Sequence, residues 1–233
     1  MLYNMEKNPK DVSSMFNRIS PQYDRANRIL SLGLDMRWRK QLANFLPHRK
    51  NLSLLDLATG TGDQILALLH QQAPLNEVVG LDFSQGMLDI AARKLRSYPN
   101  VSLLHGNAES LPFPDYSFDV CTFSFGIRNV SNPLKALSEM ARVTKPGGRC
   151  LILEFSLPDN FFRKPYVFYL RHLLPFLGGW IAKDFAAYRY LNRTIEAFPS
   201  GNSFLAWMQQ SGFSSARTIP LLFGCVSLYV GET

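Results

Sequence analysis

The chain has 233 residues, of which 46% are hydrophobic and 18% charged, and its formal net charge at pH 7 is +7. This composition excludes a disordered chain and fits one α/β domain with a sizeable core. The N-terminus lacks the apolar region of a signal peptide, and the three cysteines have neither zinc-site nor disulfide-framework spacing. We therefore expect a cytoplasmic protein with reduced cysteines.

The first fifty residues are basic and have a helical pattern. They carry ten Lys and Arg against four Asp and Glu. Apolar residues recur at helical spacing over residues 9–46, with Asp35 in position to cap a helix and with Tyr23 and Asp24 at a helix start. We expect this segment to cover the following site as a lid. Its charge suits a nucleic acid or an anionic membrane surface, and a solvated helical face explains it equally well.

The stretch Leu55–Asp63 is a buried strand followed by a glycine turn and a helix start. Gly60 and Gly62 allow a tight turn and a close approach of the backbone to a ligand. Asp56 is costly to bury without hydrogen bonds, so it either binds the turn itself or faces a ligand. The third glycine of a dinucleotide fingerprint is missing, and Asp63 at the helix start would repel a pyrophosphate. The turn therefore favours a cofactor with a cationic amino-acid moiety.

Strands and helices alternate after this turn, which predicts a parallel sheet with right-handed crossovers. The expected strands span about residues 52–57, 78–82, 101–105, 118–124 and 149–155, with two closing strands at 215–222 and 225–231. The expected helices span about residues 62–72, 85–97, 132–143 and 202–211. We expect Lys145–Gly148 to form a turn that leads into the fifth strand.

Polar residues follow the expected strands at the edge where open α/β sheets bind ligands. Asp82 ends the second strand, where an acid can bond ribose hydroxyls. Ser84 is in position to cap the next helix, and Met87 on its first turn could pack on an adenine ring, with ordinary core packing about as well supported. Asn107 and Ala108 follow the third strand, where an adenine edge would be read.

Arg128 and Asn129 emerge beyond the fourth strand, on the substrate side of the expected pocket. The alternative is a salt-bridged Arg128 and a capping Asn129. Residues 161–181 are apolar and aromatic but carry several charges, and the uncharged run Leu173–Ile181 is half the length of a membrane span. This segment could cap the pocket and contact a membrane surface, or only pack against the domain.

Several stretches resemble known methyltransferases. Residues 55–63, LeuAspLeuAlaThrGlyThrGlyAsp, resemble the first motif of the class I S-adenosylmethionine-dependent methyltransferases, with Ala58 in place of a glycine. The ubiquinone/menaquinone biosynthesis C-methyltransferases are similar at residues 23–33 with Trp38, 122–130, 142–156 and 188–195. The similarity runs from about residue 15 to residue 231. The chain departs from the family's usual residues at Ala26, Asp35, Thr144 and Tyr229, and Asp35 and Tyr229 replace histidines.

The resemblance implies a Rossmann-like class I methyltransferase fold. Its seven-stranded, mostly parallel sheet has the order 3-2-1-4-5-7-6, with helices on both faces. We expect one methyltransferase domain over residues 1–233, made of an N-terminal helical lid (1–50), a cofactor-binding core (51–156), a substrate-side insertion (157–200) and a C-terminal helix and strand hairpin (201–233).

The resemblance also implies the chemistry, which is C-methylation of a prenylated quinol by S-adenosylmethionine, with demethylmenaquinol as the first choice. The expected cofactor residues are Asp56, Gly60, Thr61, Gly62, Asp63, Asp82, Phe83, Met87, Asn107, Ala108 and Ser124. The expected catalytic and quinol-binding residues are Arg128, Asn129, Tyr23, Tyr188 and Tyr190. Arg128 would stabilise the developing phenolate, because a fixed cation lowers the pKa of a hydroxyl.

The sequence leaves other substrates and other function classes open. The sister substrate is the 2-methoxy-6-prenyl-benzoquinol of ubiquinone biosynthesis. A nucleic-acid methyltransferase fits the basic charge, but the base-flipping motif is missing after the fourth strand, so we expect no nucleic-acid partner. A NAD-dependent oxidoreductase is disfavoured by the turn, and a quinone-binding protein without activity is the last alternative. We expect a monomer or homodimer, cytoplasmic or peripheral to the inner face of the membrane, with no metal.

Overall fold

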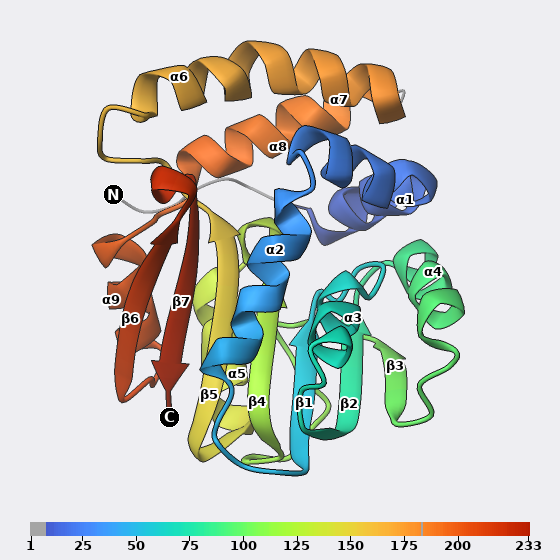
Figure 1. The fold of residues 1–233 in the computed structure, drawn as a ribbon, viewed down its shortest axis with the longest axis vertical. Helices are drawn as coiled ribbons and strands as arrows, with labels where there is room; N and C mark the ends of the chain where they lie inside the picture. The colour runs from blue at the N-terminus through green and yellow to red at the C-terminus, as the bar shows by residue number, and fades with distance from the viewer. Residues whose placement is uncertain (1–7, 183) are drawn as a thin grey trace.

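A computed structural model describes residues 8–182 and 184–233 of the chain. One sheet runs through the molecule, and helices cover its two faces and one of its ends (Figure 1). The strands are β1 (Leu52–Leu57), β2 (Leu75–Asp82), β3 (Val101–His105), β4 (Phe118–Ser124), β5 (Thr144–Phe155), β6 (Ser215–Leu221) and β7 (Val226–Glu232). Their order is β3-β2-β1-β4-β5-β7-β6, which confirms the order that the resemblance implied.

The first five strands are parallel, and β7 runs antiparallel to both β5 and β6. The inner strand β1 pairs with β2 on one side and with β4 on the other, so its polar backbone groups are used within the sheet. Because helices lie on both faces, β1 is apolar at successive positions instead of alternating with polar residues. This explains why the sequence could locate it so well.

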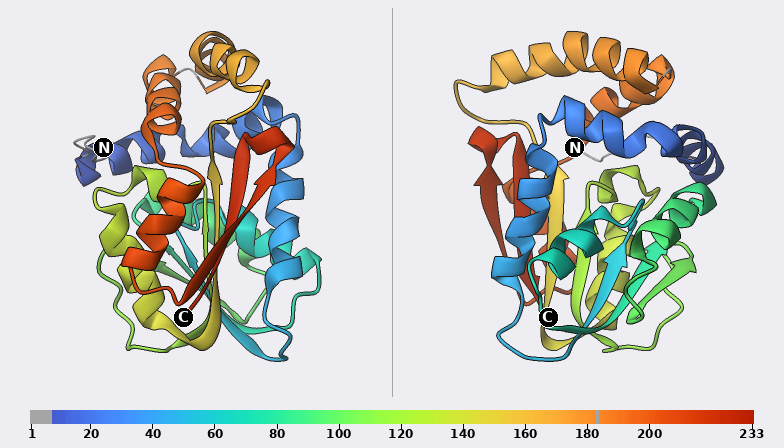
Figure 2. Two further views of the ribbon diagram at one scale, coloured as in Figure 1. Left: turned by 90° about the vertical axis from the view of Figure 1, so that its left-hand side faces the viewer. Right: turned by 45° about the vertical axis from the view of Figure 1, so that its right-hand side comes forward.

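The helices form three groups. Their bounds are α1 (Pro9–Leu30), α2 (Leu34–Gln41), α3 (Asp63–His70), α4 (Gln85–Leu95), α5 (Pro133–Val143), α6 (Arg163–Phe168), α7 (Leu174–Ala182), α8 (Phe185–Ala197) and α9 (Asn202–Gln210). Helices α2, α3 and α4 cover one face of the sheet and α5 and α9 the other, each with its own hydrophobic cluster (Figure 2). Helices α1, α6, α7 and α8 lie across the end of the sheet where its parallel strands finish (Figure 1).

Helix α1 corrects one expectation. Pro21 does not mark a helix start, since it lies inside α1. Tyr23 and Asp24 therefore lie within that helix and do not begin one. A proline inside a helix leaves the carbonyl four residues earlier without its N–H donor. Here that carbonyl belongs to Asn17, and the hydroxyl of Ser20 donates to it at 3.0 Å. The helix can therefore continue through the proline.

Two further local expectations are wrong. Asp35 does not cap α2, since Gly33 holds the cap position with a φ of 76° and Asp35 lies in the first turn, bound to other side chains. Lys145–Gly148 is not a separate turn, because β5 begins at Thr144 and includes it. The pairing of β4 with β5 is irregular there, and Gly147 has a φ of 72°, which explains the turn-like sequence.

Candidate active site

A cleft lies at the carboxyl ends of β1, β2 and β4, under α1. It encloses about 120 Å³. The expected cofactor residues that line it are Gly60, Asp82, Phe83, Met87, Asn107, Ala108 and Ser124, and Tyr23 and Asn129 line it from the expected substrate side. Asp56, Thr61, Gly62 and Asp63 are not among its lining residues. The structure therefore brings most of the expected cofactor residues together and places four of them behind or beside the cleft.

Asp56 binds the turn itself. Its carboxylate accepts hydrogen bonds from the hydroxyls of Thr59 and Thr122, both at 2.6 Å, and the side chain is buried. Burial raises the pKa of Asp56 to about 6, although the two hydroxyls oppose this shift. Of the two interpretations that the sequence left open, the structure supports the one in which this acid fixes the turn.

Gly62 allows the turn to approach α4 closely. Its φ is 82°, a conformation that favours glycine. A Cβ at this position would lie 2.8 Å from the Cδ1 atom of Leu95 and 3.4 Å from the Cβ of Ala91. Backbone geometry and packing against α4 therefore both require a glycine at position 62.

Asp82 connects the turn to the second strand. Its carboxylate accepts the backbone N–H of Gly60 at 2.7 Å and that of Ser84 at 2.8 Å. Burial raises the pKa of Asp82 above its ordinary value, and these N–H groups act in the opposite direction. Ser84 caps α4, as expected, by accepting the N–H of Met87. An acid in this position sits at the wall of the cleft and can also accept ribose hydroxyls.

The remaining cofactor candidates surround Asp82. Phe83 stacks on His105 with ring centroids 5.7 Å apart. Met87 is buried in the cluster under α1, which is the core packing that the sequence allowed, and it also lines the cleft, where its contact with an adenine ring stays a prediction. The side-chain oxygen Oδ1 of Asn107 accepts the backbone N–H of Glu109 at 2.9 Å, which fixes this side chain at the cleft wall.

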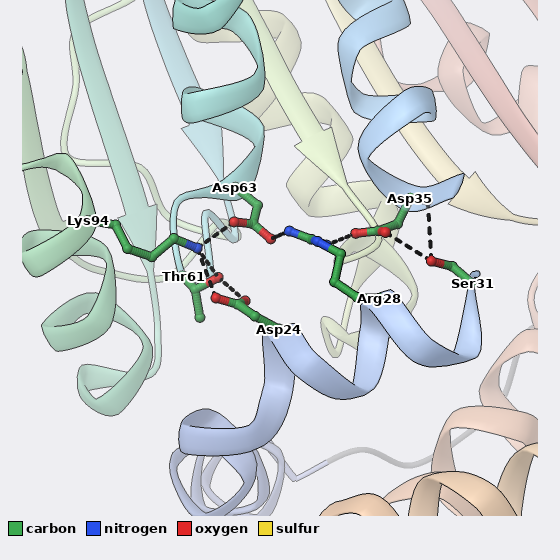
Figure 3. A network of polar contacts seen from close by, with 7 residues as sticks. All are labelled: Asp24, Arg28, Ser31, Asp35, Thr61, Asp63 and Lys94. Atoms are coloured by element: carbon green, nitrogen blue, oxygen red, sulfur yellow. Dashed lines mark hydrogen bonds and ion pairs between the residues drawn. The ribbon is translucent and has the colours of Figure 1, made fainter. Parts of the chain in front are cut away.

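The turn is also attached to helix α1, the expected lid, through charged side chains (Figure 3). Asp63 pairs with Arg28 of α1 at 2.6 Å and with Lys94 of α4. Lys94 also binds Asp24 of α1 at 2.9 Å, and the hydroxyl of Thr61 donates to Asp24 at 2.6 Å. Although burial opposes the shift, Lys94 holds the pKa of Asp63 below its ordinary value. Asp63 is therefore engaged by two cations of the chain itself.

The same network reaches α2. Arg28 pairs with Asp35, whose carboxylate also accepts the hydroxyl of Ser31 at 2.9 Å (Figure 3). A second attachment lies at the other end of the cleft, where Asn17 of α1 accepts the hydroxyl of Ser84 at 2.7 Å. We call the contacts among Asp24, Arg28, Thr61, Asp63 and Lys94 the lid network.

A larger cavity, here called the chamber, lies beside the cleft between α1, α2 and the helices α6 to α8. It encloses about 280 Å³, and most of its walls are apolar or aromatic. Phe16, Tyr23, Phe125 and Asn129 line both cavities, so the two adjoin at these residues. All five expected catalytic or quinol-binding residues line the chamber, namely Tyr23, Arg128, Asn129, Tyr188 and Tyr190.

Arg128 is buried in an ion pair. Its guanidinium pairs with Glu154 of β5 at 2.5 Å and donates to the carbonyl of Phe125 at 2.7 Å. It also lies over the ring of Phe155, 5.2 Å from the centroid. The salt-bridged alternative for Arg128 is therefore found in the structure, and the same side chain lines the chamber.

The polar atoms of the chamber wall that are buried without a hydrogen-bond partner in the described part of the chain include Oδ1 of Asn129, the hydroxyl of Tyr190 and Nε of Arg39. Burial raises the pKa of Tyr190, so its hydroxyl stays protonated at neutral pH. A buried polar atom without a partner is costly, and its presence at a cavity wall indicates a ligand with matching polar groups.

The sequence interpretation missed several residues of the site. Glu154 is the one that a sequence signal could have revealed, because it is an acid inside an apolar strand, as Asp56 is. Asn17, Arg28 and Lys94 gave no local signal, since they bind Ser84, Asp63 and Asp24, which are 67, 35 and 70 positions away and are brought close only in the folded chain.

The sheet order, the glycine turn and the acid at the tip of β2 define a class I S-adenosylmethionine-dependent methyltransferase. The fold is shared with a methyltransferase from Aquifex aeolicus, with a TM-score of 0.62 at 19% identity, covering 86% of this chain and 92% of that one. It is also shared with one from Thermotoga maritima, with a TM-score of 0.64 at 20% identity, covering 95% and 99%.

The sequence model of the ubiE/COQ5 methyltransferase family matches residues 4–233, and the chain belongs to this family. It is 46% identical to the demethylmenaquinone methyltransferase of Thermus thermophilus over 94% of this chain and 99% of that protein. It is 40% identical to the ubiquinone/menaquinone biosynthesis C-methyltransferase of Geobacter sulfurreducens over 99% and 91%. The protein is therefore an S-adenosylmethionine-dependent C-methyltransferase, and the expected cofactor and fold are confirmed.

Proposed function

We propose that the protein methylates a ring carbon of demethylmenaquinol, the last intermediate before menaquinol. The observation that carries this proposal is the junction of the cleft with the chamber at Tyr23, Phe125 and Asn129. A methyl donor in the cleft and a flat apolar ring in the chamber would meet there. The printed names of relatives such as the T. thermophilus protein support the choice of quinol.

The cleft has the groups that S-adenosylmethionine requires. We propose that Asp82 binds the ribose, that Phe83 and Met87 flank the adenine, and that Asn107 and Ala108 read its edge. Bound S-adenosylmethionine supplies a methyl group on a sulfonium, which is already a good leaving group. The protein therefore has to align the donor with the ring carbon and polarise the quinol. It does not need to form a covalent intermediate.

For Asp56, Thr61, Gly62 and Asp63 we propose an indirect role in cofactor binding. Asp56 holds the turn through two hydroxyls, and Gly62 lets it pack against α4. Thr61 and Asp63 attach it to the lid helix. Ser124, whose hydroxyl donates to Gln64 at 2.8 Å, is proposed to face the methionine part from the end of β4.

The polar wall of the chamber is proposed to bind the quinol hydroxyls. Oδ1 of Asn129 would accept one hydroxyl and the phenol of Tyr190 would donate to the oxygen of the other, which would supply the partners that both atoms lack in the described structure. Tyr23 and Tyr188 would pack against the ring. Arg128, at the same wall, would stabilise the developing phenolate directly or through water.

The ubiquinone-pathway quinol remains the second candidate because relatives such as the G. sulfurreducens protein carry both pathways in their name. A nucleic-acid substrate has less support. Arg28 and Lys94 are paired with acids of the chain, and Arg39 lies over the ring of Phe125, so part of the basic charge is used internally. We propose a cytoplasmic location with peripheral membrane contact. No helix in the described ranges is long and apolar enough to cross a bilayer.

The experiment is a turnover assay of the purified protein with a short-tail demethylmenaquinol and with the corresponding methoxy-benzoquinol, each with and without a reductant that keeps the ring as quinol. We expect methylation of the reduced naphthoquinol at a ring carbon, identified by mass spectrometry. Faster methylation of the benzoquinol supports the second candidate, and no methylation of either ring contradicts the proposal.

A further inference from the structure

The chamber opens to the surface between two turns that carry large apolar side chains. Leu32, in the turn between α1 and α2, and Leu222, in the turn between β6 and β7, both line the chamber. Nevertheless their exposed fractions are 87% and 41%. Phe223, next to Leu222, is 61% exposed. The apolar interior of the chamber is therefore continuous with an apolar surface at its mouth.

The backbone at this mouth is unusual. Leu32, Leu222 and Phe223 have φ values of 53°, 44° and 57°, a left-handed conformation that large residues other than glycine rarely adopt. Glycine or asparagine would relieve this strain. Such strain is common at ligand clamps and active sites, but Tyr116 in the loop before β4 has the same conformation, so at the mouth it adds to the argument only together with the lining of the chamber. Packing does not explain Leu32 in particular, since most of its side chain faces solvent.

Two more aromatic side chains extend the mouth toward α6. Phe162 stacks on Phe223 with ring centroids 4.1 Å apart, and Phe161 contacts Phe162 with centroids 5.7 Å apart. Figure 1 shows the turn before β7 beneath the start of α6, in agreement with this contact. We call Leu32, Phe161, Phe162, Leu222 and Phe223 the rim.

Charge favours an anionic partner for the rim. Arg163 and Lys164 follow Phe162 directly and are exposed, and Arg37 and Lys40 are exposed on α2, the helix that begins after Leu32. Asp159 is the exposed acid nearest in sequence to Phe161. The chain as a whole has a net charge of +7, which disfavours pairing with a second copy. Exposed aromatic residues next to basic ones are typical of surfaces that bind anionic membranes.

We propose that the rim inserts into the headgroup region of an anionic bilayer, and that the tail of the substrate passes between Leu32 and Leu222 into the chamber. This inference rests on the proposed function, because only a substrate with a long apolar tail requires such a path. A second copy on the same surface would close the mouth of the chamber. A bilayer keeps the mouth continuous with the phase in which the tail is dissolved.

The experiment measures flotation of the full chain with vesicles of phosphatidylcholine, alone or mixed with phosphatidylglycerol. We expect binding to the anionic vesicles that falls with salt. The variants Leu32→Asn and Phe161→Gln/Phe223→Asn should each weaken it about tenfold or more. Asparagine tolerates the left-handed conformation, so Leu32→Asn and the change at Phe223 relieve strain and should leave the fold intact.

Tyr116→Asn is the matched control. Tyr116 is an aromatic residue with a φ of 58° and 58% exposure, in the loop before β4 and therefore at the opposite end of the sheet. We expect its vesicle binding to equal that of the unchanged protein. Equal binding by the rim variants, no binding to anionic vesicles, or a dimer in sedimentation experiments that the rim variants abolish would each overturn the inference.

Turnover of a short-tail quinol in solution separates this inference from the proposed function. Phe161→Gln/Phe223→Asn should keep that turnover within about twofold and lose at least tenfold with a long-tail quinol in vesicles. If the unchanged protein turns over the soluble quinol but does not bind vesicles, only the inference fails. If it does not turn over the soluble quinol, the proposed function fails.

Discussion

The turn after β1 and the chamber under the helices are both buried, but they use polar groups differently. At the turn, the carboxylates of Asp56 and Asp82 have two hydrogen-bond donors each from within the protein. At the chamber wall, Oδ1 of Asn129 and the hydroxyl of Tyr190 have no partner within the described residues. The contrast teaches that satisfied buried groups shape a site, and that unsatisfied ones indicate what it binds.

The ion pair of Arg128 with Glu154 differs from Asn129 and Tyr190 at the chamber wall, because each of its two charges has its partner within the protein. Glu154→Ala should lower the free energy of unfolding by about 3–5 kcal/mol, since it leaves the buried guanidinium without its carboxylate. Arg128→Met/Glu154→Met should recover most of that loss. Denaturant titration measures both. Glu196→Ala, which breaks an exposed pair with Arg171, is the control and should cost at most about 1 kcal/mol.

The double variant also tests catalysis. If Arg128 stabilises the phenolate, Arg128→Met/Glu154→Met should fold but lose about 10²–10³ in turnover, with the affinity for S-adenosylmethionine unchanged. Unchanged turnover would show that the pair is only structural.

Asp56 gives the turn a pH dependence. Its pKa rises from 3.8 to about 6 on folding, so between these values the native state holds a proton that the unfolded state has lost. Its contribution to stability is therefore complete below pH 4 and is lost as the pH rises to about 6, by roughly 3 kcal/mol. The unfolding free energy of the unchanged protein minus that of Asp56→Asn should fall by this amount between pH 4 and pH 6.5. A constant difference would contradict the assignment.

Asp82 should affect the cofactor more than the fold. Asp82→Asn removes a charge that accepts two backbone N–H groups and, in our proposal, the ribose hydroxyls. We expect the affinity for S-adenosylhomocysteine to fall by about 10- to 100-fold, since hydrogen bonds to charged groups contribute about 1.5–3 kcal/mol. Calorimetric titration measures it. Tyr190→Phe is the control on the chamber side. It should leave the affinity for S-adenosylhomocysteine unchanged and weaken the binding of the quinol.

The lid network should give the smallest effect, because its charges are partly exposed. Arg28→Met or Lys94→Met should speed the dissociation of S-adenosylhomocysteine about three- to tenfold by freeing α1 from the turn. Stopped-flow fluorescence measures the rate. Arg171→Met removes an exposed pair that is not part of the lid network and should leave the rate unchanged. Equal rates in all variants would remove the lid network from the account of cofactor release.

The sequence predicted the sheet well, because the parallel strands contain short apolar runs, and β2, β3 and β4 end in a polar residue at the same edge. It located Asp82 and Asn107 at that edge for this reason. It could not predict that Asp63 faces Arg28 and Lys94, since these contacts depend on how α1 lies across the sheet. Local rules also failed at Pro21, where a serine hydroxyl replaces the missing backbone donor.

The chamber was predicted only in part. Arg128 and Asn129 were expected from their place after β4, and Tyr188 and Tyr190 from the resemblance alone. The mouth of the chamber could not be foreseen, because its strained residues lie in turns whose left-handed conformation the sequence does not reveal when leucine and phenylalanine occupy it.

Mass spectrometry of the quinones in cells that lack this protein tests the proposed methylation of demethylmenaquinol most directly. We predict that demethylmenaquinone accumulates and that menaquinone disappears, and that both effects are reversed by the unchanged protein but not by Arg128→Met/Glu154→Met. A normal menaquinone pool in the absence of the protein would contradict the account.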